Sequence, residues 1–200
     1  YQASRDWNPR FAHLDLSSQF YASCNYRLGL LGEEGHLRIR DLFIYREDYP
    51  CRYLERPMEG VQSLNDALPV LFPQIWGGKE DRPFIRLVSR FGTEPAGRIV
   101  YDSPDCRTAR ARLIGSEDLL EEITMDQAGV TFRGENALLF DRLPVFKSRE
   151  DREITMEHEG FRYSFTVEAG NILRAGADGI KIAPEDGVIR LVFGGDPGDV

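Results

Sequence analysis

Residues 153–163 have the sequence Glu-Ile-Thr-Met-Glu-His-Glu-Gly-Phe-Arg-Tyr, and this stretch has the pattern of a β-hairpin. Apolar and polar residues alternate on both sides of a short polar link, which is typical of strands that bury one face. The link ends at Gly160, and glycine adopts the left-handed backbone conformation of a tight turn at little cost. The alternation continues as far as Val167, so the stretch predicts two antiparallel strands joined by a turn.

The same hairpin pattern recurs elsewhere in the chain. Residues 122–132, with the sequence Glu-Ile-Thr-Met-Asp-Gln-Ala-Gly-Val-Thr-Phe, repeat it with a link that ends in glycine. The links that end at Gly35 and Gly187 share this pattern, which is that of a type I turn whose last residue is a glycine at a β-bulge. We expect positive φ at Gly35, Gly129, Gly160 and Gly187. The repeated stretch is too short to separate a true duplication from two solutions to one turn.

Four further strands are predicted before residue 115. Residues 20–31 alternate between apolar and polar, which predicts one half-buried strand with Cys24 on its apolar face. Residues 36–45 begin with the same alternation, so they form the second strand of a long hairpin. Residues 83–91 and 98–101 have the apolar content of shorter strands.

Two short helices are predicted between these strands. Ser63 stands at an N-cap position, and a helix over residues 63–76 is shortened or kinked by Pro69. Ser103 is a second N-cap, followed by proline at the first helical position, which predicts a helix from there to about Leu113. Cys106 then lies in the first turn of that helix.

The predicted fold class is α+β and strand-rich. An antiparallel sheet with two short helices occupies residues 1–115, and an antiparallel β-meander follows over residues 116–200 and forms a sandwich or a partly open barrel. No linker of glycine, serine or proline separates the two regions, so a single continuous domain is the alternative.

Charge and hydropathy exclude several partners. The chain has 200 residues, with 33 acidic and 25 basic side chains and a net charge of -8, so we expect no nucleic-acid partner. No apolar run approaches the roughly 20 residues of a membrane-spanning helix, so we expect no direct membrane insertion. The chain begins at Tyr1 rather than at methionine, so we expect that a preceding segment was removed. The cellular compartment therefore stays open.

The sequence contains no recognisable catalytic or metal motif. Its three cysteines and three histidines are widely spaced, and we predict neither a metal site nor a cofactor. Cys106 and Arg112 have the C-x5-R spacing of phosphatases with a cysteine nucleophile, but no glycine between them opens a phosphate-binding loop. We therefore interpret Cys106 as a small structural residue.

Residues 45–57 form the strongest candidate binding segment. They contain three tyrosines and three arginines, bounded by prolines that stiffen the chain. Tyrosine and arginine are enriched in interaction hot spots. The predicted binding residues are Tyr49, Arg52, Tyr53 and Arg56. In the alternative interpretation the tyrosines cap the core and the arginines pair with neighbouring carboxylates.

These features predict a non-catalytic binding or interaction domain, whose partner is a protein or a small acidic ligand. The domain belongs, in this interpretation, to the soluble part of a larger or membrane-anchored bacterial-type protein. The alternative is a hydrolase whose carboxylate and histidine residues converge only in the fold. A cleft with two nearby carboxylates favours the enzyme, whereas a patch of aromatic residues and arginines favours the binding domain.

Overall fold

The computed structural model describes residues 16–50, 67–71, 84–116 and 118–193 as strands joined by turns and loops. In chain order the strands are β1 (Leu16–Ala22), β2 (Tyr26–Glu33), β3 (His36–Ile44), β4 (Leu68–Leu71), β5 (Ile85–Val88), β6 (Arg98–Asp102), β7 (Ala109–Ile114), β8 (Leu119–Met125), β9 (Gly129–Gly134), β10 (Ala137–Phe140), β11 (Phe146–Glu150), β12 (Glu153–His158), β13 (Phe161–Ala169), β14 (Asn171–Gly176), β15 (Gly179–Ala183) and β16 (Val188–Phe193). The predicted strand-rich antiparallel class is confirmed, but these residues contain no helix.

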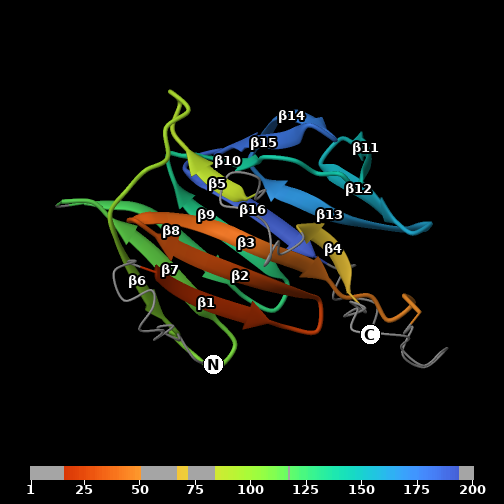
Figure 1. The fold of residues 1–200 in the computed structure, drawn as a ribbon, viewed down its shortest axis with the longest axis horizontal. Coiled ribbons are helices and arrows are strands. Elements are labelled where there is room, and N and C mark those ends of the chain that lie inside the picture. Colours follow the sequence, from red (N-terminus) through yellow and green to blue (C-terminus); the bar gives the residue numbers. More distant parts are fainter. Residues whose placement is uncertain (1–15, 51–66, 72–83, 117, 194–200) are drawn as a thin grey trace.

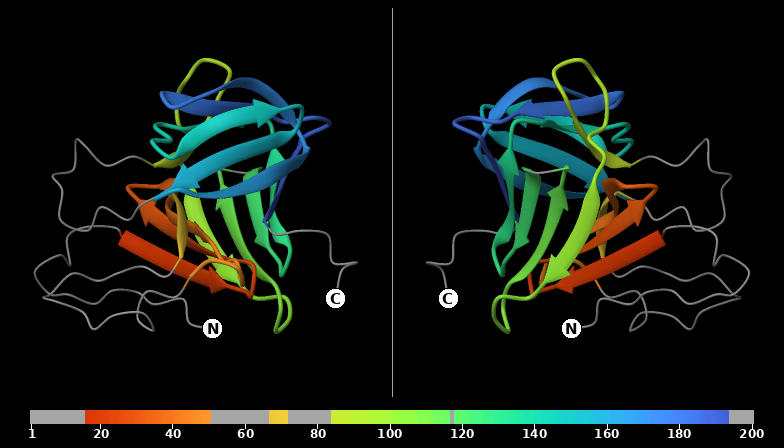
Figure 2. Two further views of the ribbon diagram at one scale, coloured as in Figure 1. Left: turned by 90° about the vertical axis from the view of Figure 1, so that its right-hand side faces the viewer. Right: turned by 90° about the vertical axis from the view of Figure 1, so that its left-hand side faces the viewer.

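The strands form two antiparallel sheets of eight strands each. The first sheet has the order β1-β2-β3-β5-β10-β15-β14, with β4 paired to β3 beside this path, and the second has the order β11-β12-β13-β16-β9-β8-β7-β6. The sheets face one another as two layers (Figures 1 and 2). Each sheet contains strands from both sides of residue 115.

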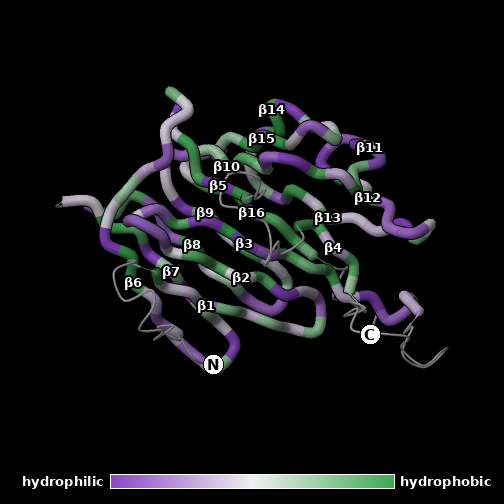
Figure 3. Tube along the Cα trace, in the orientation of Figure 1, coloured by the Kyte–Doolittle hydropathy of each residue, from purple (hydrophilic) through white to green (hydrophobic). Residues whose placement is uncertain are grey.

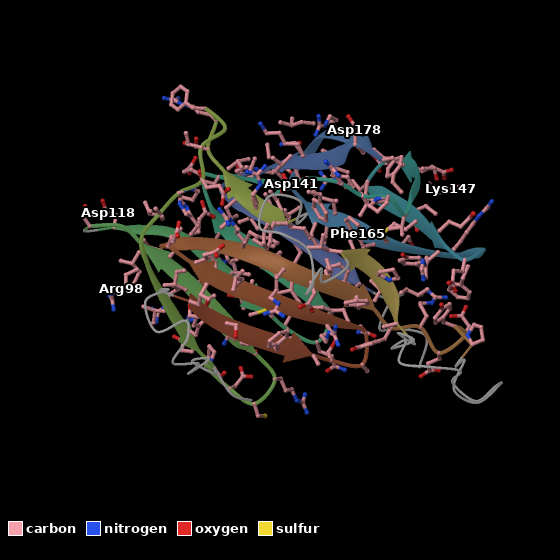
Figure 4. All side chains as sticks on the ribbon, viewed as in Figure 1. Arg98, Asp118, Asp141, Lys147, Phe165 and Asp178 are labelled. Atoms are coloured by element: carbon pink, nitrogen blue, oxygen red, sulfur yellow. The ribbon has the colours of Figure 1, made fainter. Side chains whose placement is uncertain are left out.

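The hydrophobic core lies between the two sheets. Phe140 of the first sheet stacks on Phe165 of the second with ring centroids 6.0 Å apart, and Figure 4 labels Phe165 in the interior. The rings of Tyr26 and Phe193 make a second contact between the sheets, tilted rather than stacked, with centroids 4.7 Å apart. Hydrophobic residues recur along the strands of both layers (Figure 3). Burial of alternate side chains on each sheet therefore stabilises the pair of layers.

Side-chain contacts also join the lateral edges of the sheets. At the edge formed by β1 and β6, the hydroxyl groups of Ser17 and Tyr101 lie 3.1 Å apart and share a hydrogen bond. At the opposite edge, Arg149 of β11 donates to the backbone carbonyl of Ile172 in β14 at 3.4 Å. The first and last strands of the two sheets are thereby linked, although no ladder of backbone hydrogen bonds closes them.

The helix predicted after Ser103 is wrong. Residues 103–108 form a turn, and β7 begins at Ala109. The carboxylate of Asp105 accepts a hydrogen bond from the backbone N–H of Arg107 at 2.7 Å, so the local capping residues stabilise a turn instead of a helix. Cys106 is therefore an exposed turn residue. After it, small or apolar residues alternate with arginines at a period of two, which suits a strand with one buried face.

The helix predicted over residues 63–76 is also absent from the part that the structure describes. Residues 63–66 and 72–76 lie outside the described residues, and Leu68–Leu71 forms strand β4, which pairs with the end of β3. Proline suits this position because an edge strand tolerates the loss of a backbone N–H group. No helix able to span a membrane occurs among the described residues.

The predicted single strand over residues 20–31 is divided into β1 and β2. The hydroxyl of Ser23 accepts hydrogen bonds from the backbone N–H groups of Asn25 and Tyr26, at 3.1 and 3.3 Å, so the chain reverses there. Because the chain reverses there, the residues of β1 that face the core are the opposite set from those predicted. Cys24 lies exposed in the turn, and the prediction that it faces the core is wrong.

Three of the four predicted turn glycines have positive φ. The angles are 80° at Gly35, 84° at Gly160 and 73° at Gly187, and the residue before each glycine also has positive φ. Two consecutive residues with positive φ define a type I′ turn. This turn forms instead of the predicted type I turn with its glycine bulge, because the twist of a type I′ turn matches that of the flanking strands. The prediction for Gly129 is wrong, because it begins β9 and lies against the backbone of Leu191.

Candidate functional site

Tyr49, the first of the predicted binding residues, is packed into the body of the protein. Its side chain is buried, and its ring meets the ring of Phe161 edge-on at 5.0 Å. Nearby, Arg46 pairs with Asp48 on the surface at 3.0 Å. Tyr49 therefore attaches the start of the candidate segment to β13. The other predicted residues, Arg52, Tyr53 and Arg56, lie outside the described residues.

Among the residues that the structure describes, the most exposed large apolar side chain lies in a different segment. Phe91 is 78% exposed and lies in the connection between β5 and β6, which we call the 89–97 loop. This loop extends beyond the strands in all views (Figures 1 and 2). Isolated exposed apolar residues are common on protein surfaces, so exposure alone assigns no function. The geometry of the loop supplies the second observation.

The tip of the loop is held by hydrogen bonds around Ser89. Its backbone N–H donates to the carbonyl of Thr93 at 2.8 Å, and its carbonyl accepts from the N–H of Gly92 at 2.9 Å. The hydroxyl groups of Ser89 and Thr93 are 2.7 Å apart, and the N–H of Phe91 donates to the Ser89 hydroxyl. Gly92 has a φ of 81°, which glycine adopts without a side-chain clash. The backbone that carries Phe91 is therefore organised before any partner arrives.

The base of the loop is held by ion pairs to the first sheet. Glu94 accepts hydrogen bonds from Arg38 of β3 at 2.7 Å and from Arg86 of β5 at 3.0 Å. Arg86 also pairs with Asp141, which Figure 4 labels beside β5. Burial opposes ionisation of Glu94, but the bonds from the two guanidinium groups outweigh it and hold its pKa below the usual value. Glu94 therefore stays charged and fixes the loop at neutral pH.

Two backbone contacts complete the base of the loop. The ring nitrogen Nδ1 of His36 lies 3.1 Å from the carbonyl of Pro95, and the N–H of Gly97 donates to the carbonyl of Gly35 at 2.9 Å. Both contacts join the loop to the turn between β2 and β3. His36 thus has a structural partner in the loop.

The loop tip combines an apolar ring with a cation. The guanidinium of Arg90 lies over the ring of Phe91, 4.7 Å from its centroid. Such a contact orients both side chains, and it is worth roughly 0.5–1 kcal/mol at an exposed site. The sequence predicted a strand through residue 91, so this site was missed. Serine and threonine four residues apart around a glycine are the signal that identifies the turn.

A catalytic acid often has a strongly raised pKa. Among the described carboxyl groups, Glu121 has the most strongly raised pKa. Burial raises its pKa to about 7, although hydrogen bonds from Asn136 act in the opposite direction. Its oxygen Oε1 accepts from the backbone N–H of Asn136 at 3.0 Å and also from the side-chain amide. The residue is only 1% exposed, so these bonds anchor the connection from β9 to β10. A substrate in solvent has no access to this carboxyl.

The cysteine and histidine residues that the structure describes give no catalytic arrangement. Cys24 and Cys106 are free thiols on the surface. The residues from Ala109 to Arg112 belong to β7 and pair with both of its neighbours, so their N–H groups form no loop around an anion. Within the described ranges, no group of three or more histidine, cysteine, aspartate or glutamate residues is arranged to hold a metal ion.

Comparisons of this chain with protein-family models, with curated proteins and with solved structures find no match. The candidate site is therefore defined by its own geometry, in which the 89–97 loop extends beyond the strands (Figure 1) and carries the exposed ring of Phe91 with the guanidinium of Arg90 over it.

Proposed function

We propose that the protein is a non-catalytic interaction domain that binds a partner protein through Arg90 and Phe91 of the 89–97 loop. The observation that carries this proposal is the exposure of Phe91, 78%, on a backbone held at its tip and at its base. Ordering a loop during association reduces affinity, so a loop ordered in advance leaves more of the contact energy for binding. A large aromatic side chain on such a loop has the properties of an interface anchor.

The chemistry of the tip defines the partner surface. An apolar pocket accommodates the ring of Phe91, and an acidic group at its rim pairs with Arg90. The cation lies over the ring at 4.7 Å, so the two contacts form side by side. Arginine beside an aromatic residue is a common combination in energetically important interface positions. Acidic groups are also the ligand chemistry predicted from the sequence.

The segment that contains Arg52, Tyr53 and Arg56 is retained in this proposal as a second binding surface. The burial of Tyr49 against Phe161 fits the alternative in which the tyrosines cap the core, so this part of the proposal rests on Arg52, Tyr53 and Arg56 alone. Truncation of Tyr53 and Arg52, described in the Discussion, tests this part separately from the loop.

Photocrosslinking tests the loop directly. Phe91 is replaced by the photoreactive residue p-benzoylphenylalanine, and a second protein carries the same residue at Leu119, which is also exposed but lies in β8. After irradiation in a lysate of the source organism, we expect a discrete crosslinked protein from position 91 that position 119 does not capture. The captured protein is then purified for binding measurements.

Calorimetry with the purified partner completes the test. We expect Phe91→Ala to weaken binding by at least about tenfold, because it removes the anchor. Leu119→Ala is the matched control and is expected to change the affinity less than about twofold. Equal capture at both positions, or unchanged affinity for Phe91→Ala, contradicts the proposal.

A further inference from the structure

A second group of arginines lies on the outer face of the first sheet. Arg27 of β2 and Arg40 of β3 stand on either side of Asp41, and each places its Nε 3.4 Å from a different oxygen of that carboxylate. The Asp41 side chain is only 2% exposed, whereas those of Arg27 and Arg40 are 38% and 31% exposed. We call these three residues the Asp41 cluster. It combines one buried carboxylate with two accessible guanidinium groups.

Glycine and a bulge create the room for this cluster. Gly29 of β2 is the direct partner of Asp41, and a Cβ at Gly29 would overlap the carboxylate. The next pair in the register is Leu30 with Ile39, so Arg40 is the extra residue of a β-bulge. A bulge redirects the side chain of the extra residue. The two guanidinium groups thereby approach one carboxylate from neighbouring strands.

Aromatic rings fix the direction of both guanidinium groups. Arg27 lies over the ring of Phe43 at 4.6 Å, and Arg40 lies over the ring of Phe20 at 5.2 Å. Planar guanidinium groups stack on aromatic faces and keep their N–H groups available at the edges. Phe20 is itself partly exposed, so an apolar surface lies beside Arg40.

The arginines of the Asp41 cluster make longer contacts to their carboxylate than Arg86, Arg110 and Arg190 make to theirs. Arg86, Arg110 and Arg190 each donate two or more hydrogen bonds to a carboxylate. Arg27 and Arg40 reach Asp41 only through contacts of 3.4 Å, neither makes a well-aligned hydrogen bond to a residue that the structure describes, and Arg27 Nε and Asp41 Oδ1 are buried. Charge attraction therefore holds the pair in place, but their forked donor groups keep capacity for a further acceptor.

Folding stability gives no account of this arrangement. Burial raises the pKa of Asp41, and the charges of Arg27 and Arg40, together with a weak hydrogen bond from Arg27, oppose that effect without overcoming it. Removal of a carboxylate from water is unfavourable unless good hydrogen bonds compensate for it, and Oδ1 of Asp41 has no well-formed one. With two cations and one anion the cluster has a net charge of +1, which a second anion neutralises.

We propose that Arg27 and Arg40 form a binding site for the carboxylate of a small organic acid, with Asp41 as the residue that positions them. The guanidinium forks donate to the two carboxylate oxygens of the ligand, which is the geometry that arginine prefers. The apolar part of the ligand lies against the exposed edge of Phe20. This site uses no residue of the 89–97 loop, so it is independent of the proposed protein partner.

Nuclear magnetic resonance of the arginine Nε–H groups tests the site with benzoate as the probe. At low ionic strength, where screening is weak, we expect benzoate to shift the signals of Arg27 and Arg40 saturably. Arg110, whose side chain is equally exposed but bonded to Asp102, is the internal control and is expected to stay unchanged. Acetate and inorganic phosphate are titrated in parallel to separate carboxylate binding from general attraction of anions.

Lysine variants separate a fork-specific site from simple charge neutralisation. Arg27→Lys and Arg40→Lys keep the positive charges beside Asp41, so the fold is retained, but they remove the planar fork. We expect each to weaken benzoate binding at least about fivefold, whereas Arg110→Lys does not. The absence of saturable shifts, stronger binding of phosphate than of benzoate, or full affinity in both lysine variants of the cluster overturns the proposal.

Discussion

Arg38 of β3 and Arg86 of β5 stand directly opposite one another in the first sheet, and both donate hydrogen bonds to the carboxylate of Glu94. Like charges in directly opposed positions destabilise a sheet unless an anion lies between them. Glu94 supplies that anion from the 89–97 loop. The pairing of β3 with β5 and the position of the loop therefore depend on the same three side chains.

The first prediction concerns this bridge. Glu94→Gln removes the anion and leaves the two arginines opposed, so we expect a loss of about 1–2 kcal/mol in the free energy of unfolding, between the values for exposed and buried ion pairs. Urea unfolding measures the loss, and hydrogen exchange is expected to show faster opening of residues 89–97. Asp48→Asn, which breaks an exposed pair with Arg46, is the control and is expected to have no measurable effect. Unchanged exchange in the loop contradicts the prediction.

The second prediction concerns the buried carboxyl of Glu121. Its pKa in the folded protein, about 7, lies above the ordinary value of 4.5, so the folded state holds the proton more tightly than the unfolded state does. The resulting stability is complete below about pH 4.5 and is lost as the pH rises through about 7, by at most about 3 kcal/mol. Glu121→Gln resembles the protonated form, so we expect it to be more stable than the wild type at pH 8 and to lose this pH dependence.

Unfolding curves at several pH values check the prediction for Glu121. Glu122→Gln is the matched control, because Glu122 lies on the other face of β8, 3.8 Å from Arg110. It is expected to keep the pH dependence of the wild type between about pH 4.5 and 7. Parallel pH profiles of stability for the wild type and Glu121→Gln over this range would contradict the prediction.

The third prediction separates the exposed aromatic residue from those of the core. Phe91→Ser is expected to change the free energy of unfolding by less than about 0.5 kcal/mol, because the ring packs against little besides Arg90. Phe165→Ala removes a ring stacked between the two sheets and is expected to lower it by about 3–5 kcal/mol. Thermal unfolding of both variants measures the difference. A large loss in Phe91→Ser would assign the loop a structural role.

The fourth prediction concerns the turn glycines. Gly160 has a φ of 84° and open space where a Cβ would lie, so Gly160→Ala is expected to lower stability by about 1 kcal/mol through backbone strain alone. In Gly129→Ala the added Cβ would overlap the carbonyl of Leu191, so a larger loss is expected despite the extended backbone. Equal melting temperatures for the wild type and Gly160→Ala count against the strained turn.

The fifth prediction tests the segment after Tyr49. Simultaneous truncation of Tyr53 and Arg52 to alanine is expected to leave the free energy of unfolding within about 1 kcal/mol if these residues bind a partner. Tyr49→Ala is the comparison, because its ring is buried against Phe161 and its loss is expected to remove several kcal/mol. A loss of similar size in the double variant would indicate that Tyr53 and Arg52 stabilise the fold and do not bind a partner.

Local patterns in the sequence predicted several of the strands and three of the four turn glycines. Alternation over residues 161–167 predicts the buried face of β13, because a strand places successive side chains on opposite sides. Gly35, Gly160 and Gly187 were identified for a similar reason, since positive φ is a property of the residue and its immediate neighbours. Information of this kind lies within a few consecutive residues.

Tertiary structure decided what local signals left ambiguous. The residues at Ser103 and Asp105 are compatible with a helix start and with a turn, and the burial of Ala109 against the core selected the turn followed by a strand. The break at Ser23 also depends on pairing, because β1 gains a full register with β2 only if the chain reverses there.

The candidate sites depend on contacts between strands, which neighbouring residues do not encode. Glu94 meets Arg38 across more than fifty residues of chain, with a sequence separation of 56. Arg27 and Arg40 both meet Asp41 because Gly29 leaves space for the carboxylate and a bulge at Arg40 shifts the register of β3 by one residue. Composition and spacing reveal that arginines and carboxylates are abundant, but the pairing of the strands decides which of them share a hydrogen bond.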